Sequence, residues 1–312
     1  MKGVSLVMTS RKKNNTLLVI TGPTAVGKTA LSISLAKALG THILSADARQ
    51  FYRELQVGTA TPDSAQRAQV PHHFVGHLSI HDYYNVSLYE KQALDLLGKL
   101  FKQHEYIILT GGSGLYIDTL CFGIDDLPPV SPAIRKKVQS LHAQEGLTGL
   151  REQLKALDPI YYGEVDRDNP KRLMRALEVC WSTGKPYSGL RQKRKVDRPF
   201  HIKRLVLDRP RHELFERISK RVNQMLHMGL VEEALSLFPC RHLNALNTVG
   251  YKELFAWLAG EWTLHQALEK INTNTRRYAK RQLTWFKRYD DAVFFHPDQE
   301  DEVFAWLEKK HE

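Results

Sequence analysis

Apolar and polar positions over the first forty residues follow a strand, turn and helix order. Residues 16–21 form a largely apolar run of strand length, which is typical of a strand buried on both faces. Gly22 and Pro23 end this run, and residues 28–39 then place apolar side chains at helical spacing up to Gly40. This order predicts the opening unit of an α/β fold.

The same alternation continues as far as residue 120. Strand-like segments occur at 42–45, 73–75 and 106–110, and a helical stretch at 88–103 precedes the last of them. Because strands and helices alternate, we expect a mostly parallel sheet with helices on both faces.

Strand-like runs disappear between residues 121 and 198. Helical patterns replace them at 132–145, 147–156 and 170–183. The strand pattern returns at 201–208, and the later elements are expected as helices near 211–228, 230–238, 249–258, 263–269 and 271–288 and an edge strand at 293–295. We therefore predict a core in two parts, 1–120 and 199–312, interrupted by a helical insertion domain at 121–198.

Composition and charge narrow the class of protein. Apolar residues make up 42% of the 312, and 45 Lys and Arg against 34 Asp and Glu give a net charge of +11, which favours a polyanionic partner. No run approaches the roughly 18 apolar residues of a spanning helix, and no signal-peptide pattern is visible. Because Cys121, Cys180 and Cys240 are scattered, we expect neither a disulfide framework nor a cysteine zinc site, but a cytoplasmic protein. No heptad or exposed apolar stripe stands out, so we expect a monomer.

A phosphate-binding motif lies between the first strand and the first helix. Its residues are Gly22-Pro23-Thr24-Ala25-Val26-Gly27-Lys28-Thr29, which match G-x-x-x-x-G-K-[ST]. The glycines allow the backbone to wrap an anion, and the loop N–H groups and positive helix end face its phosphates. Lys28 is expected to neutralise phosphate oxygens and Thr29 to hold Mg²⁺. The chain is thus predicted to have an α/β, P-loop NTPase-like core that binds a di- or triphosphate.

The segment after residues 106–110 disfavours a motor or switch NTPase. Such enzymes usually follow a second apolar strand with an Asp that binds Mg²⁺, whereas this strand runs into Gly111-Gly112-Ser113-Gly114. Asp47 lies just beyond the strand 42–45, where the carboxyl ends of parallel strands face the ligand. We expect Asp47 to act on an acceptor rather than on a γ-phosphate, with a helix-cap role as the alternative.

Motifs along the chain resemble those of the tRNA dimethylallyltransferase (tRNA isopentenyltransferase) family. They are residues 22–29, 45–52, 58–62, 71–73, 111–116, 169–178, 217–221 and 249–253. The resemblance implies transfer of the dimethylallyl group from dimethylallyl diphosphate to the exocyclic 6-amino group of the adenine 3′-adjacent to the anticodon. The tRNAs concerned are those that read codons beginning with U.

The resemblance also assigns roles near the diphosphate. Lys28, the loop amides and Mg²⁺ on Thr29 would stabilise the leaving diphosphate, and Asp47 would take a proton from the amine. Ser113 stands where the family usually has Thr, so the hydroxyl is kept without the methyl group that restricts its orientation. Arg217 and Arg221, one helical turn apart, would clamp the diphosphate from the far side, although surface salt bridging is an alternative for either.

Contacts with tRNA follow from the same resemblance, since the adenine must be drawn out of its loop. The implied contacts are Asp47, Ala48, Arg49, Gln50, Ser113, Arg135, Lys171, Arg172, Leu173, Met174, Arg175, Asn247, Thr248, Val249, Gly250, Tyr251 and Lys252. Residues 271–288 contain no acidic residue, and their cations Arg276, Arg277, Lys280 and Arg281 are expected to follow the RNA backbone. Residues 191–195 are either a second phosphate patch or a linker.

Other interpretations stay open. A small-molecule or nucleotide kinase shares the P-loop and an Asp near the acceptor, but it gives no reason for the basic, aromatic-bearing stretch. A non-catalytic RNA-binding protein leaves the Gly-Lys-Thr loop idle, and an adenylate-isopentenyl transferase has little use for the insertion. His72, His73, His77 and His81 raise a metal site, which their loose spacing disfavours.

Overall fold

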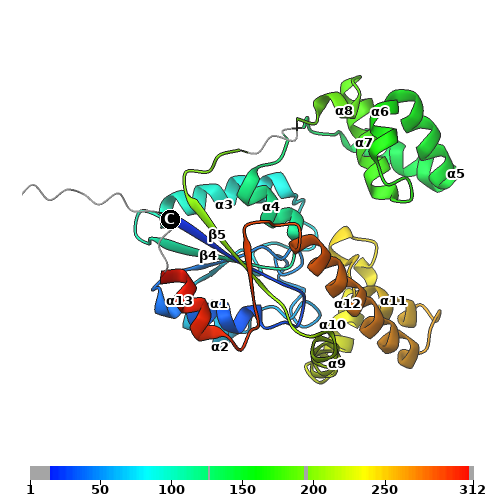
Figure 1. Ribbon diagram of the computed structural model, residues 1–312. Helices are drawn as coiled ribbons and strands as arrows, with labels where there is room; N and C mark the ends of the chain where they lie inside the picture. The colour runs from blue at the N-terminus through cyan, green and yellow to red at the C-terminus, as the bar shows by residue number, and fades with distance from the viewer. Residues whose placement is uncertain (1–14, 126, 193–195, 309–312) are drawn as a thin grey trace, which may run out of the picture. The chain divides into compact units, whose positions relative to one another are not determined.

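The computed structural model describes residues 15–125, 127–192 and 196–308 (Figure 1). They form two compact units, one of the residues up to Cys121 together with those from Arg198 onward, and the other of Phe122–Asp197. Each unit has a hydrophobic core of its own. Among the described residues, no helix combines the length and the apolar character needed to cross a membrane.

The first unit is built on a parallel sheet, as the sequence predicts. In the described part of the chain its strands are β1 (Thr16–Thr21), β2 (Ile43–Ser45), β3 (His72–His73), β4 (Tyr106–Thr110), β5 (His201–Leu207) and β6 (Ala292–Phe295). Their order is β3-β2-β4-β1-β5-β6, and each pair of neighbours is parallel. Every residue of β1 is buried, which confirms the prediction of a strand covered on both faces.

Helices cover both faces of this sheet, and others pack against one another in a second hydrophobic cluster. They are α1 (Lys28–Ala38), α2 (Ser64–Gln69), α3 (Val86–Leu100), α4 (Gly114–Phe122), α9 (Arg211–His227), α10 (Leu230–Leu237), α11 (Tyr251–Leu258), α12 (Leu264–Phe286) and α13 (Glu300–Glu308), with short 3₁₀ turns at Phe238–Cys240 and Asn244–Leu246. Figure 1 shows α1 and α13 on one face and α3 and α4 on the other.

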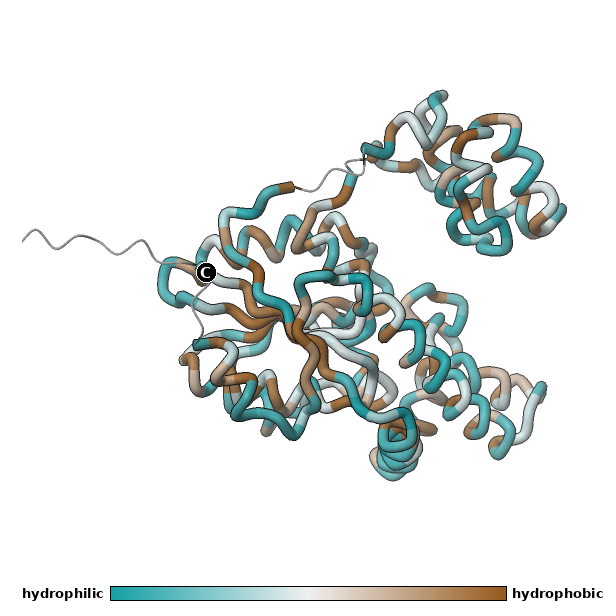
Figure 2. Tube along the Cα trace, in the orientation of Figure 1, coloured by the Kyte–Doolittle hydropathy of each residue, from teal (hydrophilic) through white to brown (hydrophobic). Residues whose placement is uncertain are grey.

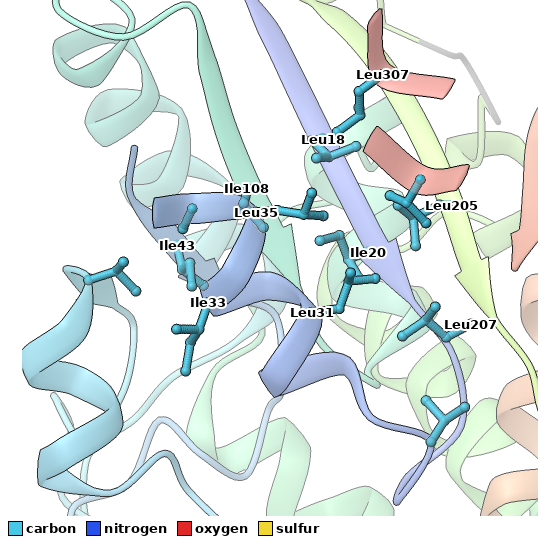
Figure 3. Packing of buried hydrophobic residues seen from close by; sticks show 14 of the residues in the cluster. Leu18, Ile20, Leu31, Ile33, Leu35, Ile43, Ile108, Leu205, Leu207 and Leu307 are labelled. Carbon is cyan, nitrogen blue, oxygen red and sulfur yellow. The ribbon is translucent and has the colours of Figure 1, made fainter. Parts of the chain in front are cut away.

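Aliphatic side chains fill the space between α1, α13 and the sheet. Leu31 and Leu35 of α1 lie over Leu18 and Ile20 of β1, and Leu307 of α13 completes the layer (Figure 3). Figure 2 shows the same concentration of apolar residues along the strands. Burying one such side chain stabilises the fold by about 1.5–3 kcal/mol, so this layer fixes the sheet from which the loops at its carboxyl edge emerge.

In the described residues of the second unit, helices are the regular secondary structure. Its helices are α5 (Pro132–Leu157), α6 (Pro159–Glu164), α7 (Pro170–Thr183) and α8 (Tyr187–Leu190). Gly146 interrupts α5 with φ 63° and ψ −148°, so α5 consists of the two predicted segments, 132–145 and 147–156. The side chain of Asn169 accepts a hydrogen bond from the Arg172 N–H and caps α7, whose first residue is Pro170.

Some predicted boundaries are wrong, for local reasons. The predicted helices 263–269 and 271–288 form the single helix α12, since no residue between them breaks the helix. The helix expected at 249 begins at Tyr251, because Gly250 has φ 100°. The third strand is 72–73 rather than 73–75, because Phe74 adopts a left-handed φ of 60°. The sequence did not predict α2, α4, α6, α8 and α13.

Histidines stack near the amino ends of β2 and β4. The Nδ1 atom of His42 lies 2.9 Å from Nε2 of His73, and the ring centroids of His42 and His104 are 4.8 Å apart. Burial, and then the neighbouring histidines, lower the pKa of both His42 and His73. The described residues contain no group of three His, Cys, Asp or Glu that could hold a metal ion.

We expect this stack to make the fold sensitive to acid. The pKa of histidine in the unfolded chain is about 6.5, and the pKa of His42 and His73 in the fold is lower, so the folded state binds fewer protons. Stability present above pH 6.5 is therefore lost as the pH falls toward the folded pKa. The urea midpoint should fall between pH 7.5 and 5.0, and less steeply in His73→Gln.

The matched control is His265→Gln, because the His265 side chain is 83% exposed. Its urea midpoint should fall between pH 7.5 and 5.0 by as much as that of the wild type. An equal fall of the midpoint in His73→Gln and the wild type would contradict the interpretation.

Candidate active site

The loops that follow β1, β2 and β4 meet at the carboxyl edge of the sheet, because parallel strands all end there. Ser113 donates its N–H to the carbonyl of Ala46 at 3.1 Å, and Ala48 donates its N–H to Oγ of Ser113 at 2.9 Å. The loops approach closely because Gly111 has no side chain: a Cβ there would lie 2.4 Å from the Ala46 carbonyl. The Asp47 and Ser113 loops are therefore joined directly.

The P-loop folds around the ammonium group of Lys28. Its Nζ donates to the carbonyl oxygens of Gly22 at 2.9 Å and Pro23 at 2.8 Å. Burial lowers the pKa of Lys28 to about 7, an effect that Asp47 opposes and Arg221 reinforces. A bound anion beside Lys28 would therefore raise its pKa toward the ordinary value of lysine.

Two further arginines reach this site from α9. The Nε atom of Arg217 donates to the carbonyl of Ala25 in the P-loop at 2.8 Å, and Nη2 of Arg221 donates to the carbonyl of Thr59 at 3.4 Å. Burial lowers the pKa of Arg221, while Asp47 raises it and Arg217 lowers it. Lys28, Arg217 and Arg221 therefore bring positive charge to the P-loop, and Asp47 is the opposing charge.

Asp47 closes a tight turn and does not cap a helix. Its Oδ1 accepts the N–H of Arg49 at 3.1 Å, and its own N–H contacts Oγ of Ser45 at 3.3 Å. The next helix in the described chain is α2, which begins at Ser64, so the helix-cap alternative is wrong. The carboxylate is half-buried and lies toward Gly112. It is thus placed between the P-loop and the glycine loop.

The sequence reasoning missed the inner face of α12. Tyr278 is half-buried, and its side chain is hydrogen-bonded to Ser113. Loss of hydration, and then the charge of Asp47, raise the pKa of Tyr278 far above its ordinary value. Gln282, one turn later, contacts both the P-loop and the glycine loop. The missed signal was the spacing of Tyr278, Gln282 and Trp285, which places them on one face of a helix.

Two predicted RNA contacts hold loops together in this structure. Arg49 donates to the carbonyls of Asn244, Ala245 and Asn247 at 3.0, 2.9 and 3.3 Å. Gln50 donates through Nε2 to the carbonyls of Thr59 and Ala60, both at 3.2 Å. The predicted segments 47–50 and 247–252 are thereby brought together.

Other predicted contacts are buried or packed within the protein in this structure. Leu173 and Tyr251 have no exposed surface, and Gly250 is also buried, so none of the three lies at the surface of this structure. Arg276 packs with its guanidinium 5.0 Å from the centroid of the Phe215 ring and donates to Oγ of Ser219 at 3.2 Å. These residues therefore make packing contacts within the protein.

The remaining predicted contacts are distributed over both units. Exposed ones are Lys171, Arg172, Asn247, Lys252, Arg277, Lys280 and Arg281, and half-buried ones are Ala48, Arg135, Met174, Arg175, Thr248 and Val249. In the predicted patch at 191–195, residues 193–195 lie outside the described chain.

Comparisons with known proteins identify the family to which the chain is similar. The family model described as IPP transferase matches residues 50–289. The tRNA dimethylallyltransferase 1 of Bacteroides fragilis is 50% identical over 293 residues, which cover 94% of this chain and 97% of the relative. The tRNA dimethylallyltransferase of Christiangramia forsetii is 45% identical over 298 residues, which cover 95% and 99%.

Solved structures show the same fold. The full-length tRNA isopentenylpyrophosphate transferase from Bacillus halodurans is 29% identical, with a TM-score of 0.68 over 94% of this chain and 95% of that one. A eukaryotic dimethylallyltransferase acting on tRNA, at 23% identity, shares the fold with a TM-score of 0.77 over 96% and 81%. With a parallel α/β core and a family model that matches most of its length, this chain belongs to the IPP transferase family.

Proposed function

We propose that this protein transfers the dimethylallyl group of dimethylallyl diphosphate to the exocyclic 6-amino group of the adenine 3′-adjacent to the anticodon. Its substrates would be cytoplasmic tRNAs that read codons beginning with U. The observation that carries the proposal is the direct joining of the Asp47 and Ser113 loops beside a P-loop whose own carbonyls hold the Lys28 ammonium. A kinase is not favoured, since the relatives are named tRNA dimethylallyltransferases.

The P-loop side of the site acts on the leaving group. As the allylic C–O bond breaks, its electron pair departs with the diphosphate, and negative charge grows on the bridging oxygen. Lys28 exchanges the carbonyls of Gly22 and Pro23 for phosphate oxygens, and Arg217 and Arg221 supply further positive charge from α9. The N–H groups of residues 25–29 complete the cradle, while that of Thr24 is bonded to Gln282.

The opposite side of the site acts on the acceptor. The adenine nitrogen forms a bond to the allylic carbon as the C–O bond breaks, and the Asp47 carboxylate accepts the proton that the amine loses. The Ser113 hydroxyl is held by the Ala48 N–H and by Tyr278, which replaces the restriction that the methyl group of Thr would give. It is thus fixed to hydrogen-bond the base or the diphosphate.

Magnesium fits the P-loop through Thr29. This residue lies in the first turn of α1, and its hydroxyl has no hydrogen-bond partner among the described residues. A hydroxyl oxygen together with substrate phosphate oxygens is a ligand set that Mg²⁺ accepts. The ion supplies charge neutralisation to the leaving diphosphate.

We propose that the protein acts as a monomer and that residues of both units contact the anticodon stem-loop of tRNA. In the first unit the exposed cations Arg277, Lys280 and Arg281 lie on α12, on whose inner face Tyr278 contacts Ser113. In the second unit the start of α7 presents Lys171 and Arg172 together with a helix N-terminus. The contacts with bases would come from residues 47–50 and 247–249 and from Lys252.

The test is single-turnover transfer by the purified protein with Mg²⁺. Unmodified tRNA with adenine next to the anticodon should acquire label from dimethylallyl diphosphate, and the same tRNA with guanine at that position should not. Transfer of phosphate from γ-labelled ATP to a small acceptor, with no prenyl transfer, would favour the kinase instead.

Asp47→Asn should bind tRNA normally and transfer the dimethylallyl group about 10²–10⁴-fold more slowly, as expected for loss of a general base.

Diphosphate binding should take up a proton at Lys28. At pH 8 the Lys28 side chain of the free protein is mostly uncharged, because its pKa is about 7. A bound anion raises that pKa. Calorimetry with inorganic diphosphate in buffers of different ionisation enthalpy should show this uptake in the wild type. Lys28→Arg is the control, since arginine stays charged; equal proton uptake by both proteins would remove Lys28 from the titration.

The exposed cations of α12 should set the salt dependence of tRNA binding. Replacing Arg277, Lys280 and Arg281 with Ala should reduce the slope of log K against log salt by about 2, at roughly 0.7 for each lost phosphate contact. The control replaces three exposed lysines on or just after α3, which are Lys91, Lys99 and Lys102. An unchanged slope in the α12 variant would exclude this helix from the RNA-binding surface.

A further inference from the structure

Gln282 of α12 joins the donor side and the acceptor side of the site. Its Oε1 accepts the N–H of Thr24 in the P-loop at 2.8 Å, and its Nε2 donates to the carbonyl of Gly112 at 2.9 Å. The residue is only 5% exposed, so water does not compete for these bonds. A single amide group therefore connects the loop proposed to hold the diphosphate with the loop that carries Ser113.

The helix lies so close to the glycine loop because that loop has no side chains where they meet. A Cβ on Gly112 would lie 2.2 Å from Nε2 of Gln282, and one on Gly114 would lie 2.3 Å from Nε1 of Trp285. Trp285 in turn donates to Oδ2 of Asp118 on α4 at 3.1 Å. The position of Gln282 is thus fixed by contacts on either side of it.

An amide is the side chain that satisfies both partners. The N–H of Thr24 needs an acceptor and the carbonyl of Gly112 needs a donor, and Gln282 offers one of each at opposite corners of a planar group. A carboxylate would keep the bond to Thr24 and place two acceptors face to face at Gly112. A thioether of the same length would leave both backbone groups without these partners.

We propose that Gln282 is a positioning residue for prenyl transfer, which fixes the separation between the P-loop and the Gly112-Ser113 loop. The inference rests on the function proposed above. Binding of diphosphate depends on the P-loop, and binding of tRNA on surfaces outside this bond, whereas transfer needs the reacting atoms about 3–3.5 Å apart. A displacement of about 1 Å between the reactants costs on the order of 100-fold in rate. Loss of Gln282 therefore lowers the rate of transfer more than the affinity for either ligand.

The test compares Gln282→Met with the wild type in three measurements. They are the single-turnover rate constant at saturating substrates, the affinity for inorganic diphosphate with Mg²⁺, and the affinity for unmodified tRNA. We expect a rate about 100-fold lower, with each dissociation constant within about threefold of the wild type. Gln224→Met, at an exposed position on α9, is the matched control and should leave all three unchanged.

A second variant separates the two bonds and guards against loss of folding. Gln282→Glu keeps the acceptor for Thr24 and breaks the bond to Gly112, so transfer should slow while the Thr24 amide stays protected from hydrogen exchange. In Gln282→Met that protection should be lost. Transfer at the wild-type rate in either variant, or a loss of diphosphate affinity as large as the loss of rate, would overturn the proposal.

Amide exchange of Thr24 also distinguishes this inference from the proposed function, because it needs no substrate. Slow exchange in the wild type that becomes fast in Gln282→Met supports the connection even in a protein that transfers no prenyl group. Thr24 exchange that is equally fast in both proteins would show that the connection does not exist in solution, whatever the reaction.

Discussion

Burial of the Lys28 ammonium is the constraint on which the site depends. Removing this charge from water is unfavourable, and in the protein alone the carbonyls of Gly22 and Pro23 offset that cost only in part, since burial still lowers the pKa of Lys28 to about 7. Asp47 favours the charge and Arg221 opposes it. An arriving diphosphate supplies the missing counter-charge, so the same group that destabilises the empty loop selects for an anion and stabilises it as a leaving group.

Helix α12 supplies further side chains to this site. Its inner face brings Tyr278 to Ser113 and Gln282 to both loops, while Arg277, Lys280 and Arg281 remain on the solvent side. One helix therefore serves the site on one face and presents cations to a polyanion on the other. This division explains why a stretch with no acidic residue is still largely packed against the core, as Arg276 is against Phe215.

The fold and the P-loop could be predicted because their signals are local. The buried strand 16–21, the glycine turn and the helix are adjacent in sequence, and Asp47 follows a strand that ends at the same sheet edge. Gln282 could not be found in this way, because its partners lie 258 and 170 residues away and the two residues before it are cations. Helices as short as α2 and α6, of 6 residues each, are shorter than the window that periodicity needs.

The most direct measurement of the central claim is a crystal structure with inorganic diphosphate, Mg²⁺ and an unmodified tRNA anticodon stem-loop. The account predicts that the diphosphate lies in the P-loop with Nζ of Lys28 moved from the carbonyls of Gly22 and Pro23 to its oxygens. The extruded adenine should then place its 6-amino group within hydrogen-bond distance of the Asp47 carboxylate. A diphosphate bound away from Lys28, or an adenine that remains stacked in the anticodon loop, would contradict the account.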